Sequence, residues 1–223
     1  MIRFDHLAVG AADLGAGAAY LRAALGVDMP TGGRHAQMGT HNLLTATGPD
    51  TFLEVIAVDP DAPAPGRARW FGLDDPAVRA GLAQGPRPLA VVCATGDLEG
   101  AIDRARGAGV DYGAPLDVTR GDLAWRFAVR GDGAIPLSGA APLLMEWGEG
   151  PHPAGRMSDL GLRYRAIRVT TPEARALARL LEALGAPGLV QVTEGAETAL
   201  EATLATAQGP DVTLAPPAPA AAR

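Results

Sequence analysis

The spacing of apolar positions changes once within the first 26 residues, and this change predicts a strand followed by a helix. Residues 2–9 alternate between polar and apolar and end in an apolar run, which is typical of a half-buried strand. From Ala18 to Leu25, apolar side chains recur at helical spacing. Asp13 is placed to cap the start of this helix, and Gly26 is placed to end it in a left-handed conformation.

The same order of elements returns twice along the chain. From residue 87 a strand, a Gly-Asp-Leu turn and a helix ending at Gly109 follow one another, and from Tyr164 the order repeats with Pro172 in the first helical turn. Three short β-like runs follow each helix, so the repeating unit is βαβββ. The runs cover residues 27–35, 41–46 and 51–58 in the first copy, 116–120, 124–130 and 142–147 in the second, and 189–194, 200–207 and 211–215 in the third.

Clusters of proline and glycine divide the chain into modules. We expect a first βαβββ module at residues 1–60, a linker at 61–86, a second module at 87–149 and a third, divergent module at 150–214. The Pro- and Ala-rich tail at 215–223 is expected to be disordered. The fold class is therefore α+β, in which repeated βαβββ modules with curved sheets form a half-barrel cleft and the third module is partial.

Composition limits the classes of partner. A net charge of −6 without any basic stripe argues against a nucleic acid or an anionic membrane surface. All 19 basic residues are arginine, which fits codon bias in a GC-rich bacterial genome. The single cysteine, Cys93, excludes an internal disulfide and fits a reducing compartment. Neither a signal-like start nor an apolar run of membrane-spanning length is present, so we expect a cytoplasmic protein with a small-molecule ligand.

Strand parity assigns several side chains to the cleft, because successive residues on a strand point to opposite faces. Phe4 and His6 on the first strand and Glu54 on the fourth all fall on the face away from the helix. With residues 47–50 as the hairpin turn, His41 lies opposite Ile56 and enters the same cleft. His41 is therefore our choice for moving a proton or orienting a substrate.

Four further side chains are predicted to contact the ligand. Phe52 shares the face of Glu54, and His35 precedes a tight turn at the mouth of the cleft. Asn42 ends the segment GGRHAQMGTHN, and Trp70 in the linker is placed to stack on a ligand from the rim. We expect His35, Asn42, Phe52 and Trp70 to bind the substrate.

Three segments carry a resemblance to a known group of proteins. FDHLAVGAADL at the start, GGRHAQMGTHN, and LEVIAVDPD at the fourth strand resemble the glyoxalase-like members of the vicinal oxygen chelate superfamily, also called the glyoxalase, bleomycin resistance and dioxygenase superfamily. The resemblance covers residues 3–150, and the third module only echoes it. It implies a cleft between two βαβββ modules, and it implies that strands one and four of each module hold a metal ion.

The resemblance also implies a set of metal ligands. His6 and Glu54 match the ligand pair of the first module, and alignment of the second module places Glu146 opposite Glu54. Ala90 falls opposite His6 and cannot ligate. One imidazole and two carboxylates suit a divalent ion such as Mn, Fe, Ni, Co or Zn, with one position open to substrate. The implied function is a metal-dependent lyase or isomerase that chelates two oxygens of a small metabolite, with His41 and Glu146 as catalytic residues.

Other interpretations remain open, including whether the chain is an enzyme. The apolar strands and Ala90 favour a metal-free protein that binds or sequesters a small molecule. In that case each buried carboxylate needs another partner, such as Arg126 or Arg34. A dioxygenase is less favoured, because its site would need a second histidine at position 90. The third module could cover a sheet edge or build a homodimer.

Overall fold

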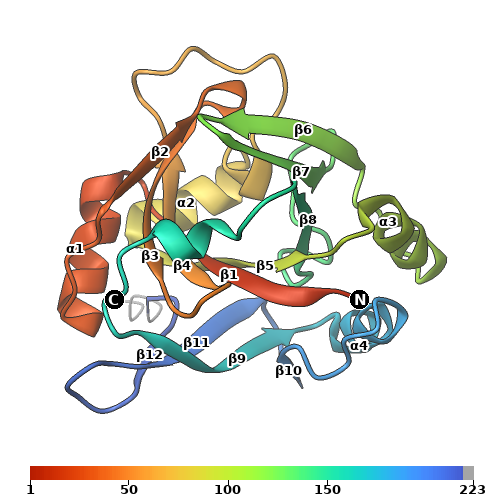
Figure 1. The fold of residues 1–223 in the computed structure, drawn as a ribbon. Coiled ribbons are helices and arrows are strands. Elements are labelled where there is room, and N and C mark those ends of the chain that lie inside the picture. The colour runs from red at the N-terminus through yellow and green to blue at the C-terminus, as the bar shows by residue number, and fades with distance from the viewer. Residues whose placement is uncertain (218–223) are drawn as a thin grey trace.

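The computed structural model describes residues 1–217, and its backbone forms two β-sheets with four α-helices packed against them (Figure 1). The larger sheet has eight strands in the order β2-β3-β4-β1-β5-β8-β7-β6, and the smaller has four in the order β10-β9-β11-β12. The predicted α+β class and the curved half-barrel are confirmed. Of the tail expected to be disordered, residues 218–223 lie outside the described residues.

The eight-stranded sheet is built from two modules with the same connectivity. Within each module the first strand pairs in parallel with the fourth, and β1 then pairs with β5 in antiparallel orientation to join the modules. The first module comprises β1 (Arg3–Gly10), α1 (Leu14–Leu25), β2 (Thr31–His35), β3 (Thr40–Ala46) and β4 (Phe52–Val58). The second comprises β5 (Arg87–Ala94), α3 (Leu98–Gly107), β6 (Ala114–Arg120), β7 (Leu123–Val129) and β8 (Leu143–Trp147).

The helix boundaries follow the caps visible in the sequence. The Asp13 carboxylate accepts a hydrogen bond from the Ala16 backbone N–H at 2.8 Å, and Gly26 ends α1 with a φ of 69°. Asp97 caps α3 in the same way, since it accepts from the Gly100 N–H at 2.9 Å. Each cap satisfies a backbone donor that the first helical turn leaves free.

The third module keeps the predicted order of elements but pairs its strands differently. Here β9 pairs in parallel with β10, the strand that follows the helix, and also pairs with β11 in antiparallel orientation. In the first two modules, by contrast, the first strand pairs with the last. The elements are β9 (Arg163–Thr171), α4 (Ala174–Ala183), β10 (Gln191–Glu194), β11 (Ala199–Ala205) and β12 (Val212–Leu214).

This smaller sheet packs against the helix-bearing face of the larger one, below β1 and β5 in Figure 1. Leu7 and Val91 of the large sheet share one apolar core with Val169 of β9 and Leu200 of β11. The third module therefore covers a sheet face rather than an edge. The concave face of the half-barrel stays free of this smaller sheet, and only the segment before β9 reaches it, through Met157.

The linker at 61–86 is more ordered than the sequence suggests. It contains a 3₁₀ turn at Trp70–Gly72 and a helix, α2 (Pro76–Gln84), whose N-cap Asp75 accepts from the Ala77 N–H at 2.7 Å. Trp70, Phe71 and Leu82 pack into a second apolar core on the concave face. The linker thus supplies part of the wall of the cleft. No helix in the described part of the chain is long and apolar enough to cross a membrane.

Candidate functional site

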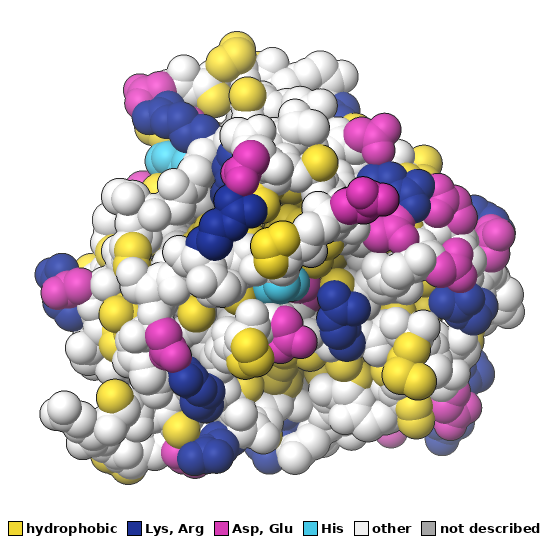
Figure 2. Space-filling model, in the orientation of Figure 1, with side chains coloured by type: hydrophobic (Ala, Val, Ile, Leu, Met, Phe, Trp, Pro, Cys, Tyr) yellow, Lys and Arg dark blue, Asp and Glu magenta, His cyan; other side chains and the backbone are white. Residues whose placement is uncertain are grey.

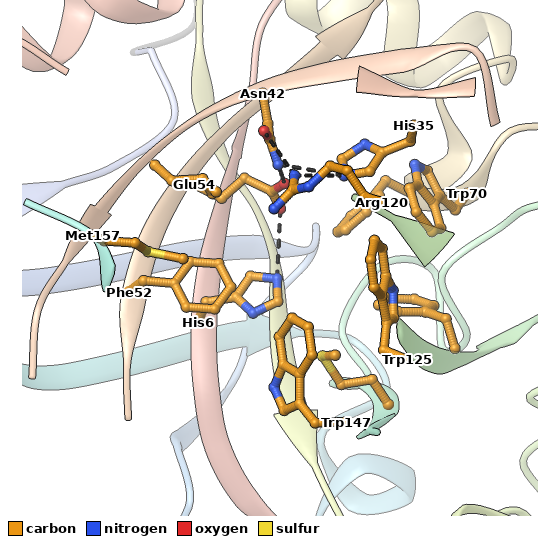
Figure 3. Close-up of a pocket in the computed structure, with 14 residues that line it drawn as sticks. His6, His35, Asn42, Phe52, Glu54, Trp70, Arg120, Trp125, Trp147 and Met157 are labelled. Carbon is orange, nitrogen blue, oxygen red and sulfur yellow. Dashed lines mark hydrogen bonds and ion pairs between the residues drawn. The ribbon is translucent and has the colours of Figure 1, made fainter. Parts of the chain in front are cut away.

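A pocket of about 420 Å³, including its open mouth, lies on the concave face of the large sheet. One wall is polar and the rest is mainly aromatic, as Figure 3 shows. The surface view in Figure 2 shows a hollow with hydrophobic side chains on its floor and basic side chains at its edge. The polar wall contains His6, His35, Asn42, Glu54 and Arg120, and the remaining lining residues are Leu44, Phe52, Trp70, Phe71, Trp125, Phe127, Met145, Trp147 and Met157.

His6 enters the pocket next to an irregularity in β1. The pairing of β1 with β5 shifts between Phe4 and His6, which leaves Asp5 as an extra residue. A bulge of this kind breaks the strict alternation of side chains. Phe4 consequently packs on the opposite face, edge-on to Tyr164, although parity places it in the cleft. The Asp5 carboxylate, fully buried, lies 2.7 Å from His6 Nδ1.

Three side chains converge on the Asp5 carboxylate. His6 Nδ1 donates to Oδ1, whereas Trp147 Nε1 donates to Oδ2 at 2.8 Å and His152 Nε2 lies 3.1 Å from the same oxygen. These hydrogen bonds lower the pKa of Asp5 against the opposing effect of burial, so the group remains ionised. Asp5 therefore ties β1, β8 and the segment after β8 together beneath the pocket.

His6 lies between two carboxylates. Its Nε2 is 3.5 Å from Glu54 Oε2, and its ring stacks on Phe52 with centroids 4.1 Å apart. Burial opposes the charged imidazolium, but the hydrogen bonds to Asp5 and Glu54 outweigh it and raise the pKa of His6 to about 9. Burial likewise disfavours the charge on Glu54, yet His6 and Asn42 lower its pKa. At neutral pH the arrangement is an imidazolium held by two carboxylates.

Asn42 and His35 form the other half of the polar wall. Asn42 Nδ2 donates to Glu54 Oε1 at 2.7 Å, and Asn42 Oδ1 accepts from the Gly33 N–H at 2.7 Å. His35 Nδ1 lies 3.0 Å from Thr40 Oγ1, and its Nε2 accepts from Arg120 Nη1 at 3.3 Å. Burial, joined by the charge of Arg120, lowers the pKa of His35 to about 4. His35 is therefore a neutral hydrogen-bonding group.

Arg120, at the end of β6, brings a cation into the pocket from the second module. Its Nη1 donates to His35 Nε2 and to Asn42 Oδ1, each at 3.3 Å, and its guanidinium lies 5.8 Å from the centre of the Trp125 ring. Among the described residues, no carboxylate lies within ion-pair distance of it. Figure 3 shows this side chain reaching across the pocket toward Asn42 and Glu54. Its remaining N–H groups are available to a ligand.

Six of the residues named from sequence line this one pocket: His6, Glu54, His35, Asn42, Phe52 and Trp70. Sequence reasoning did not place Asp5, Arg120 or Trp147 at the site. An acidic residue directly before a cleft histidine was a usable signal for Asp5. Nothing in the sequence marks Arg120 among 19 arginines, because its partners lie 78 and 85 positions away.

His41 does not line the pocket, contrary to prediction. Thr47 and Thr51 pair across the hairpin, so the loop has three residues instead of the four at 47–50. This one-residue difference sets His41 opposite Ala57 and turns its side chain to the other face, where Nδ1 is 3.9 Å from Asp59 Oδ1. Asn42 takes the position opposite Ile56 that His41 was expected to hold.

Glu146 also points away from the pocket, while its neighbours Met145 and Trp147 line it. The Glu146 carboxylate accepts a hydrogen bond from Arg126 Nε at 2.9 Å. Glu146 is therefore paired with an arginine, which was the alternative to metal binding. The register explains the difference. Residues 84 positions apart correspond between the two modules, as the N-caps Asp13 and Asp97 do, so Val92 corresponds to Ala8. Ala8 pairs with Glu54 and Val92 pairs with Leu143. Leu143, and not Glu146, is therefore the residue equivalent to Glu54.

The residues present do not fit the metal site that the resemblance implies. In the second module, Ala90 and Leu143 occupy the positions equivalent to His6 and Glu54, and neither can donate to a metal. The described residues contain no group of three or more His, Cys, Asp or Glu side chains arranged to hold an ion. His6 Nε2 instead faces Glu54, and the Arg120 cation stands in the same polar wall. The charges of His6 and Arg120 are thus already balanced by those of Asp5 and Glu54, which leaves no excess negative charge to attract a divalent cation.

The shifted pKa values of His6 and His35 predict that the folded protein is most stable near pH 6.5. The folded pKa of His6 lies above its ordinary value of 6.5, so its contribution is complete below pH 6.5 and is lost as the pH rises through about 9. The folded pKa of His35 lies below 6.5, so its contribution is complete above pH 6.5 and is lost as the pH falls through about 4. The stability profile therefore has an alkaline limb from His6 and an acidic limb from His35, each of about 3 kcal/mol over its full titration.

Urea unfolding between pH 5 and 9.5 measures both limbs while Asp5 and Glu54 remain ionised. His6→Gln should flatten the alkaline limb, and His35→Gln the acidic one. A profile that neither substitution alters would contradict the assignment of the two protonation states.

A family model described as a glyoxalase-like domain matches residues 4–185. The chain belongs to this glyoxalase-like family. The match spans both modules of the large sheet and continues through β9 and α4, and it confirms the resemblance to the vicinal oxygen chelate superfamily. No curated protein sequence matches this member of the family.

Solved structures with the same fold are distant in sequence. A hypothetical protein from Staphylococcus aureus is 12% identical with a TM-score of 0.61, and the alignment covers 89% of this chain and 88% of that one. A mutant 4-hydroxymandelate synthase from Streptomyces coelicolor is 18% identical with a TM-score of 0.50, covering 96% and 62%. A methylmalonyl-CoA epimerase from Mycobacterium tuberculosis is 18% identical with a TM-score of 0.40, covering 67% and 89%. At these identities the likeness to the first two structures concerns the fold alone, and nothing is drawn from the third, whose TM-score is below 0.5.

Proposed function

We propose that this glyoxalase-like protein binds a small aromatic molecule that carries an anionic oxygen group, and that it does so without a metal ion. The observation that carries the proposal is the pairing of an aromatic-lined pocket with a guanidinium that has no described carboxylate within ion-pair distance. Aromatic walls favour a flat apolar group through buried area and ring contacts. Arg120 offers charge-assisted hydrogen bonds to a carboxylate or a comparable oxyanion.

The polar wall also limits how the ligand is oriented. Arg120, Asn42 and His35 lie at one side of the pocket, whereas Phe127 and Met145 have no polar atoms to offer. An anionic group placed away from Arg120 would be desolvated without a partner, which is costly. The charged end of the ligand therefore belongs at Arg120, with the ring among the aromatic side chains.

Intrinsic fluorescence tests the proposal directly, because all three tryptophans of the chain, Trp70, Trp125 and Trp147, line the pocket. Titration with naphthalene-2-carboxylate should change the emission in a saturable way. The neutral analogue naphthalene-2-methanol should bind at least about tenfold more weakly, since it lacks the charge that Arg120 pairs with. The proposal fails if neither compound changes the emission, or if both bind equally.

Metal analysis supplies an independent prediction. Protein purified without chelator should contain far less than one equivalent of Mn, Fe, Ni, Co or Zn, because the pocket lacks donors from the second module. Added Mn²⁺ or Zn²⁺ should leave the affinity for naphthalene-2-carboxylate unchanged. Nearly stoichiometric metal in the wild type that disappears in His6→Ala would overturn this prediction and restore the metal-dependent lyase or isomerase.

The contact between His6 and Glu54 favours a second candidate function, which is proton transfer to or from a bound ligand. His6 is a charged acid and Glu54 a carboxylate base within 3.5 Å of each other, buried in a ligand-sized pocket. The lowered pKa of Glu54 makes it a weak base, so binding stands first. The test is deuterium incorporation beside the carbonyl of 4-phenyl-2-butanone in D₂O. Exchange above the protein-free rate that is lost in Glu54→Gln would establish this activity.

A further inference from the structure

Phe71 has an unusual backbone for a large aromatic residue. Its φ of 58° and ψ of 13° place it in the left-handed region, which residues other than glycine rarely occupy. The residue is almost completely buried. Strain of this kind persists only where the surrounding structure enforces it, and it concentrates at ligand sites.

The neighbours of Phe71 fix this conformation. The Gly72 N–H donates to the Gly133 carbonyl at 2.8 Å, and the indole N–H of Trp70 donates to Thr40 Oγ1 at 3.1 Å. Gly133 also approaches the Arg69 carbonyl so closely that a Cβ at Gly133 would lie 2.0 Å from it. The segment on each side of Phe71 is therefore anchored, one side to the first module and the other to the loop before β8.

The Phe71 side chain lies between two cavities. It lines the main pocket, and it also lines a second, narrow cavity bounded by Tyr112, Val129 and Pro136, whose volume of about 230 Å³ includes space open to solvent. Its ring packs against those of Trp70 and Phe127, each 5.9 Å away between centroids. Trp70 and Phe127 line both cavities as well, so these three rings form the partition between them.

We infer that Phe71 determines ligand length: its strained backbone holds the ring as an end wall, which restricts the main pocket to short aromatic groups and closes off the second cavity. This inference rests on the proposed binding function. Removing the ring would join the two cavities, and the combined space would accept a ligand extended along its apolar end. The space left by the Phe71 ring supplies the room for this extension, and Trp70, Phe127 and Leu143 of the second cavity offer it apolar contacts.

The experiment compares a short and a long probe in charged and neutral forms. Wild type and Phe71→Ala are titrated with naphthalene-2-carboxylate and biphenyl-4-carboxylate, and in parallel with neutral naphthalene and biphenyl. Phe71→Ala should gain at least about tenfold in affinity for both biphenyl probes, with naphthalene probes changed by less than about threefold. Phe71→Gly should show the same gain, and it is included in case the alanine variant does not fold. Glycine adopts the left-handed backbone conformation without strain.

Leu137→Ala is the matched control, since Leu137 is also a left-handed apolar residue but lines neither cavity. It should leave the preference for naphthalene intact. If folded Phe71→Ala and Phe71→Gly proteins still exclude both biphenyl probes, the inference is wrong. If no variant binds either carboxylate but the variants gain neutral biphenyl, the end wall is upheld and the proposed anionic ligand is rejected.

Discussion

Replacing Asp5 with alanine is expected to destabilise the folded protein by about 3–5 kcal/mol, because it leaves a buried charged network without its acceptor. The carboxylate is fully buried and takes hydrogen bonds from His6 and Trp147, with His152 Nε2 at 3.1 Å. Its loss would leave the charged His6 imidazolium with Glu54 as its single carboxylate partner. The indole N–H of the half-buried Trp147 would also lose its acceptor, which adds to the cost.

Thermal and urea unfolding of Asp5→Ala measure this effect. For a protein of this size the change should lower the unfolding midpoint by roughly 10 °C. Asp61→Ala serves as the control, since the Asp61 side chain is 72% exposed and pairs with Arg34 at the surface. Exposed ion pairs contribute at most about 1 kcal/mol, so this control should scarcely shift the midpoint. Equal shifts in the two variants would show that Asp5 is not the centre of a buried network.

The loss of Asp5 should weaken ligand binding as well as the stability of the fold. Asp5 holds Trp147, and Trp147 lines the pocket, so the loss of Asp5 releases one aromatic wall as well as His6. Asp5→Asn keeps the shape of the side chain but removes its charge. It should fall between wild type and Asp5→Ala in unfolding free energy, because an amide oxygen can still accept one of the hydrogen bonds.

Much of the fold follows from local patterns. The period of two in β1 and β4 placed His6, Glu54 and Phe52 on one face, and those side chains do line a common pocket. The N-cap aspartates located both helices of the large sheet. These features depend on residues close together in the chain, and their physical causes act over a few residues.

The errors arose where a single residue changes the register. The extra residue Asp5 moved Phe4 out of the cleft, and the short hairpin loop turned His41 away and Asn42 inward. Neither event alters the hydrophobic pattern enough to be seen in the sequence. The prediction of Glu146 as a metal ligand was wrong for a related reason. The pairing of β5 with β8 puts Leu143 in the position equivalent to Glu54.

The remaining features depend on contacts between distant segments. The smaller sheet has the βαβββ order, but its pairing of β9 with β10 is decided by packing against the large sheet. Arg120 meets His35 and Asn42 only because β6 lies near β2 at the two ends of the curved sheet. A sequence without aligned relatives contains no local signal for such an approach, and the most informative residue of the site was missed for that reason.

Arg120→Ala is expected to weaken the binding of naphthalene-2-carboxylate by about 10- to 100-fold. A hydrogen bond to a charged group contributes about 1.5–3 kcal/mol, and that range corresponds to this loss of affinity. The neutral naphthalene-2-methanol should bind within about twofold of its affinity for wild type, because it does not use the charge. Arg120→Lys should recover part of the loss, since an ammonium keeps the charge but cannot offer two parallel N–H groups.

Arg156→Ala is the control for a general effect of positive charge. Arg156 lies near Arg120 in the outer part of the cleft but is paired with Asp122. Its removal should leave the affinity for the carboxylate within about threefold of wild type. If Arg156→Ala and Arg120→Ala weaken binding equally, the anion is attracted by the rim as a whole. If only Arg120→Ala weakens binding, and only for the charged probe, the Arg120 guanidinium directly holds the anionic group. Arg120 then supplies the positive charge that binds the ligand, a role that the resemblance had assigned to a metal ion.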